Sequence, residues 1–405
     1  MVTLVDVEYI TYHEGNALLD WLELAAAIEQ GHQMSKAEVK DTFIYRKEDT
    51  LLSRSAWIDG LGIAVKSATI FPQNSLHSVP KINGAVSLFS DKTGVLEAIL
   101  DFHLVTKWKT AGDSITAALR LAKPGSKNIL IVGAGTVGHS LLDAYSSAFP
   151  NAFFQVWNRT HERAVSITSG RSNAVAIEDL EAGVRNADII SCATMSKQSI
   201  IKGDWLRPGQ HLDLIGAYRP DMREVDDLSL CRSKIFVDSY DTTIEHIGEL
   251  KIPLKEKVIS RADILADFYQ INKFTRESDN EITIFKNGGG AHLDLMVAKY
   301  ILNAWQKNIA HFSGGSDSTE QAYMNNKLLE FQNIIEDTLF GGQVKKFGKN
   351  PFTSIIDPFE FQIVQDYLEE GISLMTFFGH ASSGYGFSQN IDQPDNWNNT
   401  GKYPL

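Results

Sequence analysis

Residues 129–160, ILIVGAGTVGHSLLDAYSSAFPNAFFQVWNRT, contain the pattern that decides the fold. Four apolar residues form a predicted strand, and Gly133, Gly135 and Gly138 follow at GxGxxG spacing before a helix-like run over 136–147. In such a unit the first glycine permits a tight turn, the second lets backbone amides approach a pyrophosphate, and the third lets the helix pack on the strand. The stretch therefore predicts a dinucleotide-binding strand, turn and helix. The alternative is a glycine turn in an α/β fold that holds no nucleotide.

The residues after the next predicted strand, 153–157, indicate which nicotinamide cofactor this loop binds. An NAD site has an Asp or Glu here, against the ribose 2′-hydroxyl, whereas this chain has Asn158, Arg159 and Thr160. A carboxylate would repel a 2′-phosphate, but a guanidinium can bind it with two hydrogen bonds. We therefore expect NADPH as the cofactor, with NADP preferred over NAD. The predicted cofactor-binding residues are Gly133, Gly135, Thr136, Val137, Gly138, Asn158, Arg159, Thr160, Ala193, Thr194, Met195 and Gly216.

Length and composition describe a globular protein with material for two or three domains, since the chain has 405 residues and 43% hydrophobic content. A net charge of −12 without clustered Lys or Arg argues against nucleic acid and membrane partners. The two cysteines, Cys192 and Cys231, exclude a disulfide framework and a thiolate metal cluster, and we predict no metal site. The sequence has no signal-peptide pattern at its start and no apolar run that could span a bilayer. We therefore expect a cytoplasmic enzyme.

The order of predicted elements divides the chain into three regions. Residues 1–120 mix helix-like and strand-like runs, which predicts an α+β domain. Residues 121–282 alternate strands with helical or polar stretches, which predicts a doubly wound parallel Rossmann sheet. Residues 283–305 are expected to return to the first region, and the character of the chain changes in 306–405. The predicted fold class is therefore α/β, with an α+β N-terminal domain and an extra C-terminal α/β fragment.

Three lysines in the first region are candidates for binding a substrate. Lys66 lies in the apolar strand GIAVKSATIF, where burying a charge is costly unless the charge is paired. Its alternative is a solvated lysine on the outer face of the strand. Lys107 and Lys109 flank Trp108 just before the helix that leads into the nucleotide region. Two cations near a nicotinamide suit a substrate carboxylate, although a solvated helix start would also explain them.

Two loops complete the candidate site. The loop GAYRPDMREVD, residues 216–226, leaves the fourth strand at the carboxyl end, where open α/β sheets bind ligands. The triple glycine 288–290 precedes a helix-like run, so its amides could hold an anion or the segment could be a hinge.

Over about its first 305 residues the chain resembles the ornithine cyclodeaminase and mu-crystallin family. From about residue 57 onwards its motifs follow those of the family in the same order and register. The resemblance is carried by KSATIFPQN, TGVLEAILDFHLVTKWKTAGDS, GAGTVG with WNRT, GAYRPDMREVDD, VDSYDTTIEHIGEL and ITIFKNGGGAHLDLMVAKYI. It implies a homodimer formed through the N-terminal domain, and a substrate pocket between that domain and the nucleotide domain. It also implies that Lys66 and the residue at position 109 bind a substrate carboxylate. The family typically adds an N-terminal arginine; Arg54 and Arg46 are the candidates, and we take Arg54.

The chain departs from the family pattern at two positions. The family arginine is Lys109 here, which keeps the charge but loses the planar fork. In the true cyclodeaminases the fourth-strand loop carries an aspartate that handles the substrate amine, and Tyr218 stands there in this chain. With Arg219 it makes the loop more similar to mu-crystallin, whose branch reduces cyclic ketimines. Reduction is therefore favoured over cyclodeamination, although Asp221 could substitute for the missing carboxylate.

The resemblance and the residues together predict an NADPH-dependent reductase of cyclic imino acids, such as pyrroline- or piperideine-2-carboxylate. We expect Lys66, Lys109 and Tyr218 to be catalytic, and Arg54, Lys66, Lys109 and Arg219 to bind substrate. Two alternatives stay open. One is an ornithine cyclodeaminase with tightly bound NAD(P), and the other is a non-enzymatic protein that binds NADPH and a small ligand.

The C-terminal segment needs a separate interpretation. Ten of the 21 Phe residues lie in 306–405, which is too aromatic for a disordered tail. HFSGGSDSTEQAY, IIEDTLFGG, ISLMTFFGHASSGYGF and NNTGKYPL resemble the front part of gingipain-type cysteine peptidase domains, which implies His380 as their histidine. No cysteine follows Cys231, so this chemistry would have no nucleophile. We expect an incomplete, catalytically silent fragment.

Overall fold

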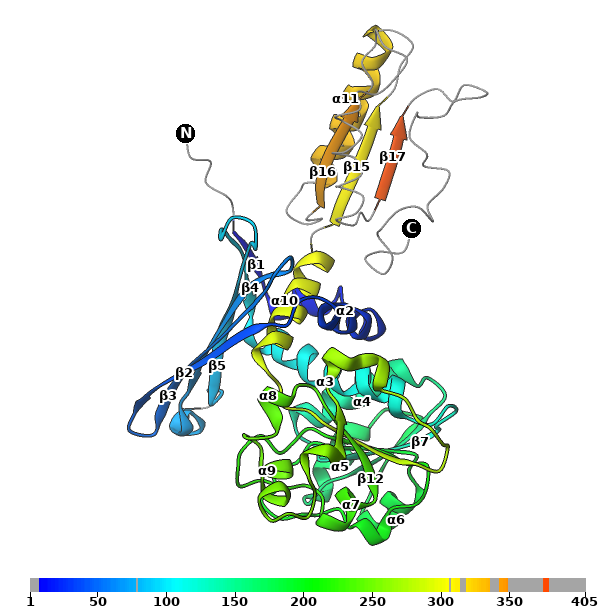
Figure 1. Ribbon diagram of the computed structural model, residues 1–405. Helices are drawn as coiled ribbons and strands as arrows, with labels where there is room; N and C mark the ends of the chain where they lie inside the picture. Colours follow the sequence, from blue (N-terminus) through cyan, green and yellow to red (C-terminus); the bar gives the residue numbers. More distant parts are fainter. Residues whose placement is uncertain are drawn as a thin grey trace. The chain divides into compact units, whose positions relative to one another are not determined.

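The computed structural model describes residues 7–77, 79–305, 307–313, 318–335, 342–348 and 374–378. The chain forms two compact units, Met1–Ile301 and Leu302–Leu405. The first unit contains two sheets and the second contains one, as Figure 1 shows.

A six-stranded sheet is built from the N-terminal part of the first unit. Its order is β1-β6-β5-β4-β3-β2, with β1 parallel to β6 and every other pair antiparallel. The strands are β1 (Glu8–Ile10), β2 (Glu38–Arg46), β3 (Asp49–Ile58), β4 (Gly62–Ile70), β5 (Ile82–Phe89) and β6 (Leu96–Asp101), and the helical segments are α1 (Tyr12–Asn16), α2 (Trp21–Gln33), η1 (Pro72–His77) and α3 (Phe102–Leu121). Alternate residues of β4 are buried, as expected for a sheet with one face on the core. The side chain of Asp101 caps α3 by accepting a hydrogen bond from the Leu104 amide.

The second sheet has eight parallel strands in the order β13-β12-β14-β11-β10-β7-β8-β9. The strands are β7 (Asn128–Val132), β8 (Phe153–Trp157), β9 (Ala174–Ile177), β10 (Ile189–Cys192), β11 (His211–Leu214), β12 (Ser233–Val237), β13 (Ile264–Ala266) and β14 (Ile282–Lys286). The helical segments are α4 (Thr136–Ala148), α5 (His161–Thr168), α6 (Leu180–Asn186), η2 (Gly203–Trp205), α7 (Asp227–Cys231), α8 (Tyr240–Thr243), α9 (Gly248–Lys255), η3 (Arg261–Asp263) and η4 (Phe268–Lys273). The strand order reverses between β7 and β10, which is the point where open α/β sheets bind ligands. The predicted α/β fold class is confirmed.

One expected boundary differs from the structure. We expected residues 283–305 to return to the N-terminal region, but β14 lies inside the parallel sheet, between β12 and β11. All five residues of β14 are buried, and a strand buried on both faces belongs in the centre of a parallel sheet. The return begins with α10 (Ala291–Trp305), where Tyr300 bonds the backbone of Asp20 and Lys299 pairs with Glu97.

In the second unit, β15 (Lys307–Ser313) pairs in parallel with β16 (Gly342–Gly348) and β17 (Leu374–Phe378), and α11 spans Ser318–Ile335. His380 lies outside the described residues. None of the helices that the structure describes is long and apolar enough to cross a membrane.

Candidate functional site

The glycine loop between β7 and α4 has the geometry that a dinucleotide requires. Gly133 has a φ of +110°, and a Cβ on Gly138 would lie 1.9 Å from the Gly133 carbonyl oxygen, so neither position tolerates a side chain. Gly135 faces open space and begins α4 without a side-chain cap. The amides of the first helical turn are therefore unobstructed towards an anion, and these residues fit a dinucleotide pyrophosphate.

The end of β8 supports this loop. Asn158 Oδ1 accepts a hydrogen bond from the Ala134 amide at 3.0 Å, and its Nδ2 donates to the Thr160 carbonyl at 2.8 Å. The side chain of Arg159 is exposed, and within the described residues it has neither a hydrogen bond nor an ion pair. Its guanidinium therefore has all its donors free beside the predicted ribose position.

The loops after β10 and β11 are tied together by a buried carboxylate that the sequence did not reveal. Glu224 Oε1 accepts hydrogen bonds from the Thr194 amide at 2.7 Å and hydroxyl at 2.8 Å. Glu224 Oε2 accepts from the amides of Gly216 at 2.7 Å and Ala217 at 3.1 Å. Behind it, Glu249 accepts from the Glu224 amide at 2.6 Å. The loops that carry Thr194 and Gly216 are thus fixed against each other at the carboxyl edge of the sheet.

Two further predicted cofactor residues lie on the loop after β10. The Ala193 amide donates to the Val132 carbonyl at 2.8 Å, and a Cβ on Gly133 would lie 2.7 Å from the Ala193 carbonyl oxygen. Met195 is 74% exposed, so its side chain is accessible to a ligand.

A cluster of three cations surrounds Asp294, and we call it the cation cluster: Arg54, Lys66 and Lys109. Arg54 and Lys66 are cross-strand partners on β3 and β4, whereas Lys109 lies two turns into α3. Lys66 Nζ and Lys109 Nζ both lie 2.9 Å from Asp294 Oδ1. Lys109 Nζ and Arg54 Nη1 donate to the Gly289 carbonyl at 3.1 and 2.9 Å. Three elements of the N-terminal part and the start of α10 therefore place these charges at one point.

The charges in this cluster change each other's ionisation. Burial lowers the pKa of Lys66 to about 8, although Asp294 opposes that shift. Burial alone would raise the pKa of Asp294, but Lys109, Lys66 and Arg54 together lower it to about 2. Asp294 is thus a carboxylate at any working pH. Sequence reasoning missed it, and the available signal was one acidic residue in the apolar helical run LDLMVAKYI.

The cation cluster adjoins the same edge of the parallel sheet as the glycine loop. Gly289 follows the carboxyl end of β14, has a φ of +67°, and donates its amide to Asp238 Oδ2 at 2.8 Å. Asp238 itself follows the carboxyl end of β12. Because all strands of this sheet are parallel, these ends share one edge with the loop after β7. The Gly289 amide thus binds a carboxylate of the chain itself.

Some residues singled out in the sequence lie away from the cluster. Lys107 Nζ donates to Asn16 Oδ1 at 2.8 Å and lies near aromatic rings, so it is not a solvated helix start. Arg46 pairs with Asp49 at the exposed end of a hairpin, whereas Arg54 is partly buried and lies in the cation cluster.

Among the residues that the structure describes, the loop after β11 has no hydrogen bond or ion pair to the cation cluster. Tyr218 is 60% exposed, and Arg219 pairs with Asp221 at 3.0 Å. Asp221 also pairs with Lys197 at 3.0 Å, and hydrogen bonding to Lys197 lowers its pKa. An exposed, doubly paired carboxylate of this kind is a poor proton acceptor. Asp221 therefore does not fit the role of a substitute for the missing family aspartate.

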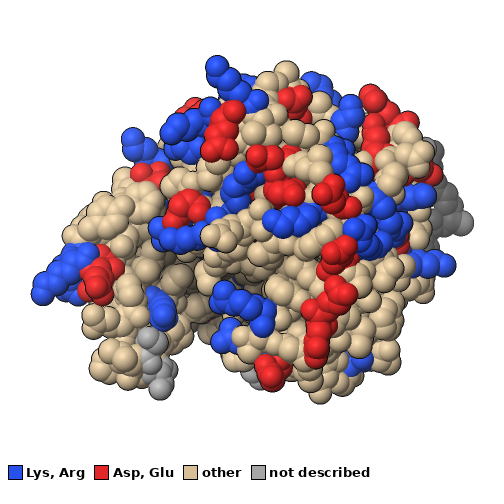
Figure 2. Space-filling view, turned by 90° about the horizontal axis from the view of Figure 1, so that it is seen from below, with Lys and Arg blue, Asp and Glu red and all other residues tan. Residues whose placement is uncertain are grey.

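One face of the molecule is hollowed, and Figure 2 shows Lys and Arg side chains, together with some Asp and Glu, around the hollow. In the part of the chain that the structure describes, no three His, Cys, Asp or Glu side chains are grouped for a metal ion.

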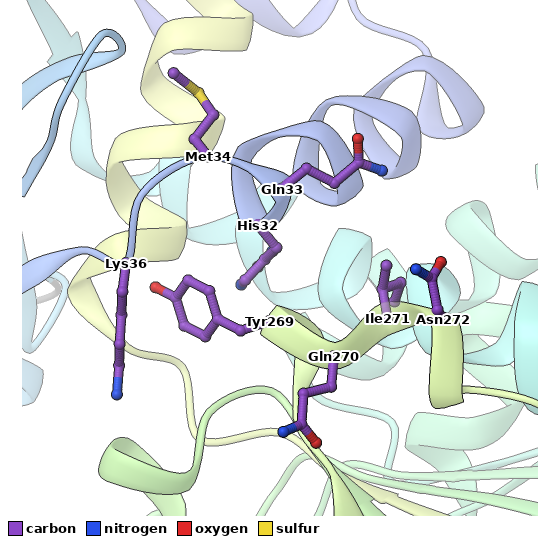
Figure 3. Close-up of a pocket in the computed structure, with 8 residues that line it drawn as sticks. All are labelled: His32, Gln33, Met34, Lys36, Tyr269, Gln270, Ile271 and Asn272. Carbon is purple, nitrogen blue, oxygen red and sulfur yellow. The ribbon is translucent and has the colours of Figure 1, made fainter.

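A separate cavity of about 430 Å³ lies where the end of α2 faces η4 (Figure 3). Its lining is His32, Gln33, Met34, Lys36, Tyr269, Gln270, Ile271 and Asn272, so it includes none of the predicted site residues. His32 donates from Nδ1 to the Ile28 carbonyl at 2.7 Å, and burial lowers its pKa to about 3. Its ring lies 5.2 Å from that of His292, next to the start of α10. This cavity is a neighbour of the cation cluster but not part of it.

Residues 29–308 match the ornithine cyclodeaminase/mu-crystallin family, and the chain belongs to this family. It is 44% identical over 302 residues to a delta(1)-pyrroline-2-carboxylate reductase of Paracoccus denitrificans, covering 73% of this chain and 96% of that protein. It is 31% identical over 245 residues to the ketimine reductase mu-crystallin of Rattus norvegicus, covering 60% of this chain and 76% of the relative.

Among solved structures, the fold is similar to that of the Thermococcus litoralis delta(1)-pyrroline-2-carboxylate reductase in complex with NADH and L-proline. That match has a TM-score of 0.68 and 26% identity, and covers 74% of this chain and 97% of the other.

Proposed function

We propose that this protein is an NADPH-dependent reductase of cyclic imino acids, with pyrroline- or piperideine-2-carboxylate as substrate. The observation that carries the proposal is the cation cluster of Arg54, Lys66 and Lys109 beside the edge of a dinucleotide-binding sheet. Relatives named as pyrroline-2-carboxylate and ketimine reductases support the same reaction.

The cluster provides what a ring carboxylate needs. Arg54, Lys66 and Lys109 would bind the carboxylate by charge-assisted hydrogen bonds and fix the ring against the nicotinamide. When bound, a reduced nicotinamide supplies a hydride to the C=N carbon, and the nitrogen takes a proton that comes from solution. Imine, reduced nicotinamide and proton would thus give a secondary amine and the oxidised nicotinamide. Tyr218 and Arg219 stay predicted contributors from the loop after β11.

Cofactor choice rests on the end of β8. We propose that the unpaired guanidinium of Arg159 binds the 2′-phosphate of NADPH, next to Asn158 and Thr160. The remaining predicted cofactor contacts come from the glycine loop and from the residues after β10 and β11 that Glu224 holds in place.

The test is a substrate panel. Wild-type protein is mixed with NADPH or NADH and with five- and six-membered cyclic imino acids, and loss of the reduced nicotinamide is followed by absorbance. We expect oxidation of NADPH with at least one of these rings and a lower rate with NADH. Ornithine is the discriminating control. Release of ammonia from ornithine without net use of NADPH would replace this proposal with the cyclodeaminase, and no turnover of either kind would favour a binding protein.

We also propose a homodimer formed through the six-stranded sheet. All nine residues of its edge strand β2 are exposed, including the large apolar side chains of Val39, Phe43, Ile44 and Tyr45. An exposed apolar edge strand usually marks an interface. Sedimentation equilibrium that gave the mass of a monomer at micromolar concentration would contradict this.

We propose that the two parts of the first unit have different roles. Residues 1–120, together with α10, bind substrate and form the dimer, and the domain built on the parallel sheet binds the cofactor. A variant from which β2 has been deleted should be monomeric. If it kept the mass of a dimer, the assignment of dimer formation to residues 1–120 would be contradicted.

A further inference from the structure

Asp294 has one oxygen that the cation cluster does not use. Lys66 and Lys109 share Oδ1, each at 2.9 Å, whereas Oδ2 is buried without a hydrogen-bond partner among the described residues. Only 2% of the Asp294 side chain is exposed. Burying a carboxylate oxygen without a hydrogen bond costs free energy. Such an atom therefore indicates a ligand that donates a hydrogen bond to it.

The proposed substrate presents a matching group. Before hydride transfer the ring nitrogen is protonated, and a positively charged iminium beside three cations would be repelled unless an anion faced it. Two other carboxylates near the cluster are already engaged. Asp41 pairs with Arg54, and Asp238 accepts hydrogen bonds from Gly289 and Thr243.

A second buried carboxyl, Asp113, lies one helical turn from Lys109 on α3, and both of its oxygens also lack a partner within the described residues. Burial, with Asp238 and Asp213 nearby, raises its pKa well above the usual range, which favours its neutral form. A neutral carboxyl offers much less to a cation than the ionised Asp294 does.

We propose that Asp294 Oδ2 accepts the hydrogen bond of the protonated ring nitrogen, while Arg54, Lys66 and Lys109 bind the ring carboxylate. This inference rests on the proposed function and names the form of the substrate that the site selects, the zwitterionic iminium acid. Asp294 then has two roles, since one oxygen holds the lysines and the other contacts the nitrogen. The saturated product, a cyclic secondary amino acid, carries the same charge on nitrogen and should bind the same oxygen.

The test compares two saturated ring acids that differ in one atom. Proline and tetrahydrofuran-2-carboxylate have the same ring size and carboxylate, but only proline has a cationic nitrogen. For a six-membered preference the pair is pipecolate and tetrahydropyran-2-carboxylate. Dissociation constants are measured by calorimetry on the protein saturated with the oxidised nicotinamide. Wild-type protein should prefer the amino acid, and equal affinity for the two ligands would overturn the proposal without any variant.

Asp294→Asn should reduce the preference for the amino acid by about 10- to 100-fold, the range expected for a buried hydrogen bond to a charged group. Thr106→Val is the matched control, because the Thr106 hydroxyl is the other partner of Lys66, at 2.8 Å, and its loss loosens the lysine but keeps the carboxylate. It should change both affinities by the same factor.

If Asp294→Asn also changed both affinities equally, Asp294 would serve only to anchor the lysines, and the proposal would be wrong. If wild-type protein reduced no cyclic imine at all, the proposed function itself would fail, which the substrate panel shows separately.

Discussion

Glu224→Gln should weaken both the fold and the binding of the nicotinamide cofactor, because this one carboxylate holds two of the loops at the cofactor edge. Its two oxygens accept four hydrogen bonds, from the amide and hydroxyl of Thr194 and from the amides of Gly216 and Ala217. Glutamine has nearly the same shape but only one accepting oxygen.

The magnitude follows from the four donors. The smaller loss occurs if the new NH₂ group turns towards Thr194, because that hydroxyl can then accept a hydrogen bond from it. The Thr194 amide is still left without an acceptor, which costs about 1–3 kcal/mol in a buried site. The two bonds to Gly216 and Ala217 lose their charge assistance, about 0.5–1 kcal/mol each. We expect the free energy of unfolding to fall by about 2–5 kcal/mol.

Two assays check this. Denaturant unfolding measures the stability, and fluorescence titration measures the dissociation constant for NADPH, which should rise at least about tenfold, or about 1.4 kcal/mol. Glu178→Gln is the control, because this side chain is 84% exposed and makes one long contact with His161. A loss of under about 1 kcal/mol together with unchanged NADPH affinity would refute the idea that Glu224 sets the loop positions.

Two further predictions concern ionisation and cofactor choice. Burial lowers the pKa of His211 from 6.5 to about 3, so between these values only the unfolded chain binds the proton, and stability falls as the pH drops through 6.5. Between about pH 7.5 and 5 the free energy of unfolding should fall by about 2 kcal/mol for this reason. His211→Asn, which keeps a hydrogen-bond donor for Thr283, should remove that part of the pH dependence. The control His103→Asn, at an exposed position, should not remove it. Arg159→Ser should lower the preference for NADPH over NADH by about 10- to 100-fold in kcat/KM, and Arg163→Ser, an equal loss of charge on α5, should change it less. An unchanged ratio in Arg159→Ser would contradict the 2′-phosphate assignment.

The cofactor edge of the fold was readable from the sequence because its pattern is local. The strand, the glycines and the helix of 129–148 lie next to each other in the chain, and a side chain at Gly133 or Gly138 would be strained or would clash. The boundary at β14 was not readable in the same way. Its five buried residues look like any apolar run, and only pairing with β11 and β12 places them inside the parallel sheet.

The candidate substrate site was likewise predicted only in part from the sequence. Lys66 stood out because a lysine in an apolar strand must find a partner, but its partner is 228 residues away on α10. Spacing could not choose firmly between Arg54 and Arg46, and only the structure shows that Arg54 is paired across the sheet with Lys66. Glu224 and Asp294 carry no local motif, and both were missed.

The sequence alone therefore determined the α/β class and the glycine loop of the parallel sheet. It also predicted the residues at the ribose end and the two lysines, since each depends on neighbours within one element or on the cost of burying one charge. Tertiary structure alone decided which carboxylates face these groups. The buried ion pairs of Asp294 depend on how four elements pack around one point. Spacing along the chain does not predict that three cations of the N-terminal part meet at the first turn of α10.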